Sequence, residues 1–78
     1  MKKTTLTTTR YQLPEHFYVD VLTEKDEVSF WLGHRECDMK EQMFAASAAF
    51  APEEKWEQMI EDNLDDYLED FKETWLED

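Results

Sequence analysis

Two short stretches of the sequence contain residue types that could support chemistry. His34 and Cys37 form a His-x-x-Cys pair with Asp38 beside it, a combination that could ligate zinc or activate a thiolate. A structural zinc site needs four ligands and the chain has one cysteine, while a thiolate nucleophile would need a third group to orient the histidine. We therefore expect His34 to be a strand-end residue opposite Phe17, and Cys37 to be a small buried residue.

The second stretch, Asp62-Asn63 with Asp65-Asp66, has the residue types that bind calcium but not the glycine turn or the loop spacing of an EF-hand. The sequence also contains no glycine-rich phosphate loop and no platform of basic and aromatic residues for nucleic acid. We therefore predict that the protein is not an enzyme, uses no metal or cofactor, and does not bind nucleic acid directly.

The most pronounced chemical feature is a pair of acidic rows in the last third of the chain. The first row, with a spacing of four, is Glu57, Glu61, Asp65, Glu69, Glu73 and Glu77, and the second is Asp62, Asp66 and Asp70. Like charges at this spacing destabilise a helix by roughly 0.2–0.5 kcal/mol per pair, so the first row alone costs about 1–2.5 kcal/mol. A charge run of this kind is either a solvated face or a binding surface, and the sequence leaves both open.

The negative charge is unevenly distributed along the chain. The whole chain has a net charge of −12, and residues 53–78 contain twelve acids and two lysines, which gives −10 for this segment. As a helix the segment would be about 39 Å long, so one net charge falls on roughly every 4 Å, close to the ~3.4 Å of a single DNA strand. Such a surface repels nucleic acid and anionic lipid and attracts basic partners.

The acidic rows must be positioned by a long amphipathic helix over residues 52–77. Its apolar side chains recur at steps of three and four, the period of a helix with one buried face. They are Trp56, Met59, Ile60, Leu64, Tyr67, Leu68, Phe71 and Trp75. Pro52 suits the first helical position, and Glu53 and Glu54 in the first turn favour the helix dipole.

The preceding part of the chain is predicted to form strands over residues 4–13, 16–23 and 28–34, the first at a sheet edge, with a turn at Pro14 and a hairpin loop at residues 24–27. The loop length predicts a register in which Val21 pairs with Phe30, Val19 with Leu32, Tyr18 with Gly33 and Asp20 with Trp31. One face then holds Phe17, Val19, Val21, Val28, Phe30 and Leu32. We expect the helices to pack on this face.

Residues 38–50 are predicted to form a short helix, with Asp38 as N-cap and Glu41 three residues later. The second face of the sheet holds Tyr18, Leu22 and Trp31, together with Tyr11 from the first strand. This face is either covered by the short helix or a terminal segment, which we favour, or it is an aromatic patch for a partner. The expected fold is a single α+β domain over residues 1–78, in which an antiparallel sheet of two to three strands precedes two helices packed on one face.

In size, acidity and lack of catalytic groups, the chain resembles the small phage or mobile-element inhibitors of host nucleases, the anti-CRISPR and anti-restriction proteins. The resemblance is one of class and assigns no residues. It implies an inhibitor that mimics nucleic-acid charge and blocks a basic nucleic-acid-binding protein such as a nuclease. The acidic rows supply the expected contact residues, which are Glu57, Glu61, Asp62, Asp65, Asp66, Glu69, Asp70 and Glu73.

Two other interpretations remain open. The protein could be a homodimer or an adaptor whose interface is either the face with Tyr11, Tyr18, Leu22 and Trp31 or the Trp75-Leu76 end. Alternatively, its acidity could serve only solubility, as in a salt-loving host. The single cysteine fits a reducing compartment. The N-terminal residues lack the apolar run of a secretory signal, and no segment is apolar enough to span a membrane. We therefore expect a cytoplasmic protein, monomeric or homodimeric, in the host cytoplasm if it is phage-encoded.

Overall fold

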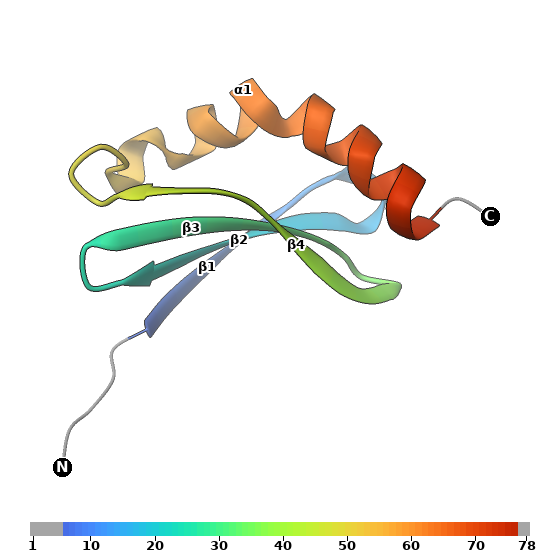
Figure 1. Ribbon diagram of the computed structural model, residues 1–78, viewed down its shortest axis with the longest axis horizontal. Helices are drawn as coiled ribbons and strands as arrows, with labels where there is room; N and C mark the ends of the chain where they lie inside the picture. The colour runs from blue at the N-terminus through green and yellow to red at the C-terminus, as the bar shows by residue number, and fades with distance from the viewer. Residues whose placement is uncertain (1–5, 77–78) are drawn as a thin grey trace, which may run out of the picture.

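The computed structural model describes residues 6–76 and has an α+β fold, in which a four-stranded sheet precedes a long helix (Figure 1). The elements are β1 (Leu6–Gln12), a 3-10 turn η1 (Pro14–His16), β2 (Phe17–Glu24), β3 (Glu27–His34), β4 (Cys37–Ser47), α1 (Glu53–Phe71) and a π-helical turn η2 (Lys72–Leu76). The predicted α+β class is confirmed, but the sheet has four strands where two to three were predicted, and one long helix follows it where two were predicted. Glu77 and the predicted strand residues 4 and 5 lie outside the described residues.

The sheet is an antiparallel meander in the order β1-β2-β3-β4, so consecutive strands are neighbours and β1 lies at an edge as predicted. The β2–β3 register is also confirmed, because Val21 pairs with Phe30 and Val19 with Leu32. Both strands extend one residue further into the hairpin than predicted. Glu24 pairs with Glu27, which leaves a two-residue turn between them and preserves the register.

The predicted helix over residues 38–50 is wrong, because this segment forms the edge strand β4. The pairing of β4 with β3 shifts by one residue between Phe44, opposite Phe30, and Gln42, opposite Trp31. Met43 is the extra residue of this β-bulge, and it is buried next to the partly buried Phe44. Met43 and Phe44 are consecutive and both point inward, which breaks the alternation of a strand. The apolar residues of this segment therefore have a spacing that resembles that of a helix. Pairing with β3 outweighs the helix propensity of the Ala- and Met-containing segment.

The core lies between the sheet and α1, on the predicted face of the sheet. Its six residues Phe17, Val19, Val21, Val28, Phe30 and Leu32 are each at most 3% exposed. The helix buries Trp56, Ile60 and Phe71 against them and packs Met59, Leu64, Tyr67 and Leu68 at the margin. Trp56 Nε1 donates a hydrogen bond of 2.7 Å to the carbonyl of Ala51, which satisfies its polar atom in the core. A single helix therefore covers the face where two were predicted.

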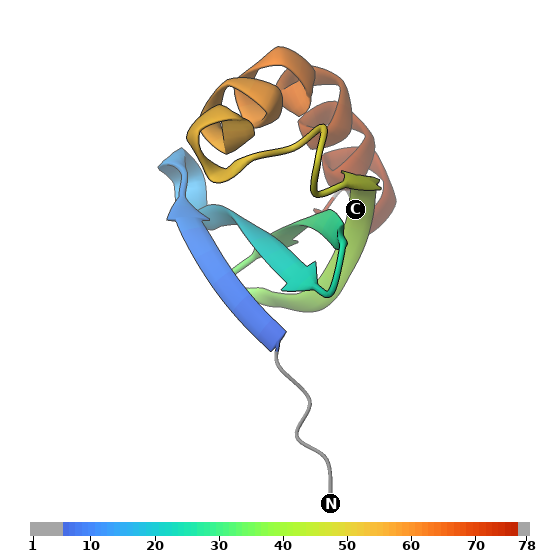
Figure 2. The same ribbon diagram turned by 90° about the vertical axis from the view of Figure 1, so that its left-hand side faces the viewer.

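The other face of the sheet, which we call the open sheet face, has no described helix or loop over it (Figures 1 and 2). The predicted cover by a helix over residues 38–50 is wrong because those residues extend the sheet instead. In Figure 2 the twisted sheet lies below α1, and all of α1 lies on one side of it. An antiparallel sheet commonly has one packed face and one face toward solvent.

Candidate functional site

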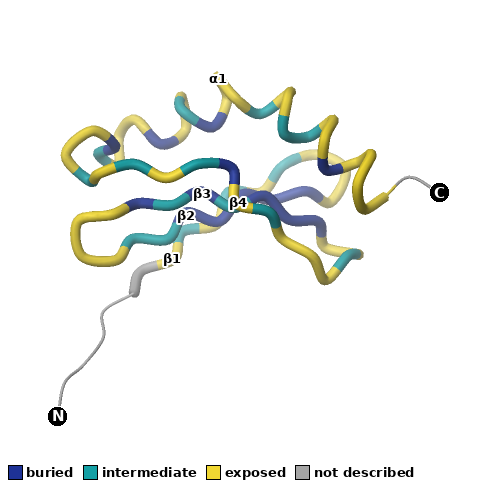
Figure 3. The backbone as a smooth tube through the Cα atoms, in the orientation of Figure 1, coloured by how far each residue is buried: buried dark blue, intermediate teal, exposed yellow. Residues whose placement is uncertain are grey.

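The eight carboxylates predicted as contact residues lie on the side of the helix that faces away from the sheet, and we call them the acidic ridge. All eight are exposed, seven on α1 and Glu73 on η2. In Figure 3 the outer side of α1 is mainly exposed, and its buried positions face the strands. The helical period that buries Trp56, Ile60 and Phe71 thus places the acidic rows together in solvent.

The acidic ridge has no basic partner within the described part of the chain. The ion pairs there use other carboxylates, those of Asp20, Glu15 and Glu36. Lys72, next to the ridge in sequence, pairs with Glu15 at 3.7 Å between Nζ and Oε1. The ridge carboxylates therefore keep their full charge toward solvent, available to a cationic partner.

The three aromatic residues predicted as a secondary interface do not share one face. Tyr11 pairs with Val19 and packs against the core on the helix side, whereas Tyr18 and Trp31 belong to the open sheet face. Burial raises the pKa of Tyr11, and the negative charges of Glu53 and Glu57 raise it further. The grouping of Tyr11 with the other two aromatic residues is wrong, because the β1–β2 register places its side chain beside Val19.

Tyr18 and Trp31 offer less free aromatic surface than the sequence suggests. Tyr18 is buried, because the Arg10 guanidinium lies 3.9 Å from the centre of its ring and Gly33 lies beneath it. An added Cβ at Gly33 would lie 2.7 Å from Tyr18 Cε1, so the close approach of the ring requires glycine here. Trp31 is half-buried, and its Nε1 donates to Ser29 Oγ at 3.1 Å.

A charged cluster on the open sheet face was not predicted from the sequence. Asp20 is 3% exposed, and it accepts hydrogen bonds from Arg10 Nε at 2.7 Å, Arg10 Nη2 at 3.0 Å and Lys40 Nζ at 2.8 Å. Burial of Asp20 opposes ionisation, but the hydrogen bonds and charges of Arg10 and Lys40 outweigh it, so the pKa lies below its ordinary value. Asp20 at a mid-strand position is the available signal in the sequence, but the predicted helix over residues 38–50 places Lys40 outside the sheet.

The His34–Cys37 pair lies at the two-residue turn between β3 and β4. His34 pairs with Phe17 across the sheet, as predicted, and the two ring centres are 4.6 Å apart. Its Nδ1 accepts the backbone N–H of Glu36 at 3.2 Å, and Cys37 is half-buried. Among residues 6–76, no group of three or more His, Cys, Asp or Glu side chains is arranged to hold a metal ion.

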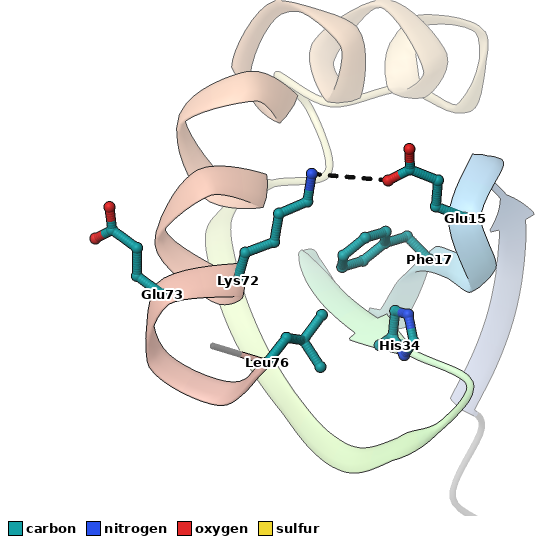
Figure 4. Close-up of a pocket in the computed structure, with 6 residues that line it drawn as sticks. All are labelled: Glu15, Phe17, His34, Lys72, Glu73 and Leu76. Carbon is teal, nitrogen blue, oxygen red and sulfur yellow. Dashed lines mark ion pairs between the residues drawn. The ribbon is translucent and has the colours of Figure 1, made fainter. Parts of the chain in front are cut away.

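A pocket of about 390 Å³ lies at the end of the sheet where η1, the start of β2 and η2 meet, and we call it the end pocket. Its lining residues are Glu15, Phe17, His34, Lys72, Glu73 and Leu76 (Figure 4). The figure shows Lys72 reaching toward Glu15 above the Phe17 ring, with Leu76 and His34 below. The carboxylate of Glu73 turns away from the other five side chains.

Comparison of the chain with protein-family models, with curated proteins and with solved structures finds no match. Over the described residues, no helix combines the length and apolar character that crossing a membrane requires. The surfaces and the pocket described above are therefore the features from which a function can be inferred.

Proposed function

We propose that the protein is a small, non-enzymatic inhibitor that presents its acidic ridge to a basic nucleic-acid-binding protein, such as a nuclease, in place of nucleic acid. One observation carries the proposal. Eight exposed carboxylates form a continuous surface along α1 and η2, and no cation of the described residues pairs with them. A cationic channel that binds a phosphate backbone would attract the same arrangement of charge.

The energetics of the helix support a role for these charges in binding. Within the described residues the ridge contains six like-charge pairs at a spacing of four, from Glu57 to Glu73 and from Asp62 to Asp70. They cost about 1–3 kcal/mol at low ionic strength, a noticeable share of the 5–15 kcal/mol typical of a domain. A surface selected for solubility alone would gain from interspersed lysines, which remove this cost without loss of hydration.

The first test is a pull-down from bacterial lysate at near-physiological salt, read by mass spectrometry. The baits are the wild-type chain and a ridge variant with Asp62→Asn, Asp65→Asn, Asp66→Asn and Glu69→Gln. A matched control removes four exposed carboxylates elsewhere, with Glu24→Gln, Asp26→Asn, Glu27→Gln and Asp38→Asn. Both variants have the same net charge, so they separate the position of the charge from its amount.

The proposal expects one nucleic-acid-binding protein to be retained by the wild type and by the matched control, lost by the ridge variant, and displaced by added DNA or RNA. Retention by the ridge variant would refute the charge mimic. Equal loss from both variants would reduce the interaction to bulk electrostatics, without a role for the ridge.

A second candidate function, an adaptor or homodimer that uses the open sheet face, is favoured by a hollow of about 260 Å³ on that face. The hollow lies among Thr8, Asp20, Leu22, Trp31 and Lys40, and no described element lies over it. Light scattering across a range of concentrations, with Trp31→Ala as the variant, tests self-association. A monomer at high concentration, with unchanged Trp fluorescence, would count against a homodimer.

A further inference from the structure

The end pocket is continuous with the acidic ridge, because Glu73 belongs to both. The stem of Glu73 lines the pocket, and its carboxylate points outward (Figure 4). A partner that covers the ridge as far as η2 therefore reaches the mouth of the pocket. The two features form one surface, with charge along the helix and a hollow at its end.

The backbone around the end pocket is unusual on two sides. Glu15 and His16 have φ angles of 62° and 72°, in the left-handed region that side chains other than glycine rarely adopt. On the other side, η2 is a π-helical turn, and such turns are frequent at functional sites. Strained backbone persists where the surrounding structure fixes it, and it concentrates at binding sites. The two segments are far apart in sequence, and both line this pocket.

The interior of the end pocket is apolar, with the imidazole of His34 at its wall. Phe17 and Leu76 supply the apolar surface, and Lys72 is paired with Glu15 at the rim. His34 is 8% exposed, and its Nδ1 is occupied by the Glu36 N–H, so the neutral ring carries its proton on Nε2. In the described part of the chain Nε2 takes part in no hydrogen bond, and it stays partly open to solvent. The pocket therefore suits an apolar group with a hydrogen-bond acceptor next to it.

The charges of the chain and of the pocket lining determine which kind of ligand can enter the end pocket. A free carboxylate would be repelled by a chain of net charge −12. An ammonium group inside the pocket would find no free carboxylate among the lining residues, because Glu15 is paired with Lys72 and the carboxylate of Glu73 points outward. An apolar side chain of a polypeptide meets neither obstacle, and its own backbone carbonyl can accept the Nε2–H of His34. Basic residues on either side of it would be attracted to the ridge.

We propose that the end pocket receives one large apolar side chain from the basic partner, which anchors that partner at the C-terminal end of the ridge. The inference rests on the proposed function and adds the partner's chemistry, a cationic segment that contains an apolar anchor. Binding energy at protein interfaces concentrates in a few such anchors seated in pockets, while the surrounding charges set orientation and association rate.

Two blocked synthetic peptides test the anchor by NMR titration of the full chain. Both contain lysine and arginine on either side of one central residue, which is phenylalanine in one peptide and alanine in the other. We expect the phenylalanine peptide to bind about tenfold more tightly, as partial burial of one aromatic side chain predicts. Resonances of Phe17, His34 and Leu76 should shift with this peptide and not with the alanine peptide.

Three variants test whether the preference for the phenylalanine peptide arises in the end pocket. Leu76→Gln removes apolar surface from the pocket, and Met39→Gln is the matched control, since the two side chains are 37% and 40% exposed and Met39 does not line the pocket. The tenfold preference should fall to about twofold in the first variant and persist in the second. His34→Asn keeps an acceptor for the Glu36 N–H and removes the Nε2 donor, so it should weaken binding of the phenylalanine peptide.

The outcomes separate the anchor from the ridge. Equal, salt-sensitive binding of both peptides, with shifts only along α1, would overturn the anchor and leave the proposed function standing. A phenylalanine preference that survives Leu76→Gln would also overturn it. Binding that keeps this preference but is unaffected by the four ridge substitutions would support the pocket and contradict the proposed role of the ridge. Failure of both peptides to bind at low salt would overturn the anchor as stated.

Discussion

The carboxylates of this protein occupy two opposite environments, one at Asp20 on the open sheet face and the other along the acidic ridge of α1. Asp20 is buried and accepts three hydrogen bonds from Arg10 and Lys40, whereas the ridge carboxylates are exposed and have no cation from the described residues. The residues described here include six lysines and arginines, and two of them are used on a single buried acid. The fold thus neutralises the charge that it buries and leaves its solvent-facing charge uncompensated.

The largest expected effect concerns Asp20. In Asp20→Asn the amide group would place a donor against Lys40 or Arg10, and the buried site would lose its negative charge. We expect a loss of about 2–3 kcal/mol in the free energy of unfolding, below the usual figure for a buried pair because both cations can turn to water. Urea titration followed by Trp fluorescence measures the loss. Asp65→Asn on the ridge is the control; it removes two like-charge pairs, so it should raise stability, by at most about 1 kcal/mol.

The next effect tests whether the open sheet face is packed as closely as a core. Gly33→Ala places a methyl group against the Tyr18 ring, and we expect it to destabilise the fold by about 2 kcal/mol. In a Tyr18→Leu background the same substitution should cost much less, because the clashing ring is absent. The double-mutant cycle by urea unfolding gives the coupling. An equal cost in both backgrounds would show that the loss arises elsewhere.

The sequence was sufficient to predict the parts of the fold that follow simple periodicity. The β2–β3 register followed from alternating apolar residues and a short polar turn, and the C-terminal helix followed from its apolar stripe. It was insufficient for β4, because the bulge at Met43 places two apolar residues side by side and imitates a helical stripe. A bulge depends on pairing with β3, which one strand alone does not encode.

The same error hid the cluster around Asp20. Lys40 reaches Asp20 only because β4 pairs with β3 and places it beside Gly33, so a helix over residues 38–50 removed it from the sheet. The end pocket was hidden for a different reason. Its lining includes Glu15 and Lys72, which are far apart in sequence. Glu15 lies in a turn with positive φ angles that no local sequence pattern predicts. The acidic ridge, by contrast, needs only the helical period.

Neutralising the ridge should stabilise the fold. The ridge variant with Asp62→Asn, Asp65→Asn, Asp66→Asn and Glu69→Gln removes five like-charge pairs at a spacing of four, so its free energy of unfolding should rise by about 1–2 kcal/mol at low salt. The gain should shrink as salt screens the repulsion in the wild type. Thermal or urea unfolding at two ionic strengths measures it. The matched control at Glu24, Asp26, Glu27 and Asp38 should gain less, and an equal gain would attribute the effect to net charge alone.

The smallest effect is a pH dependence confined to the buried acid. Folding lowers the pKa of Asp20 below its ordinary value of 3.8, so its ionised form stabilises the folded state above that pH. The contribution is lost as the pH falls through the lowered pKa. The stability gap between wild type and Asp20→Asn should therefore be full near neutral pH and narrow as the solution is acidified below about pH 4. The gap between wild type and Asp65→Asn should stay small throughout, because this exposed residue has no buried ion pair to lose. A gap for Asp20→Asn that stays constant to low pH would mean that shape, and not charge, holds Asp20 between Arg10 and Lys40.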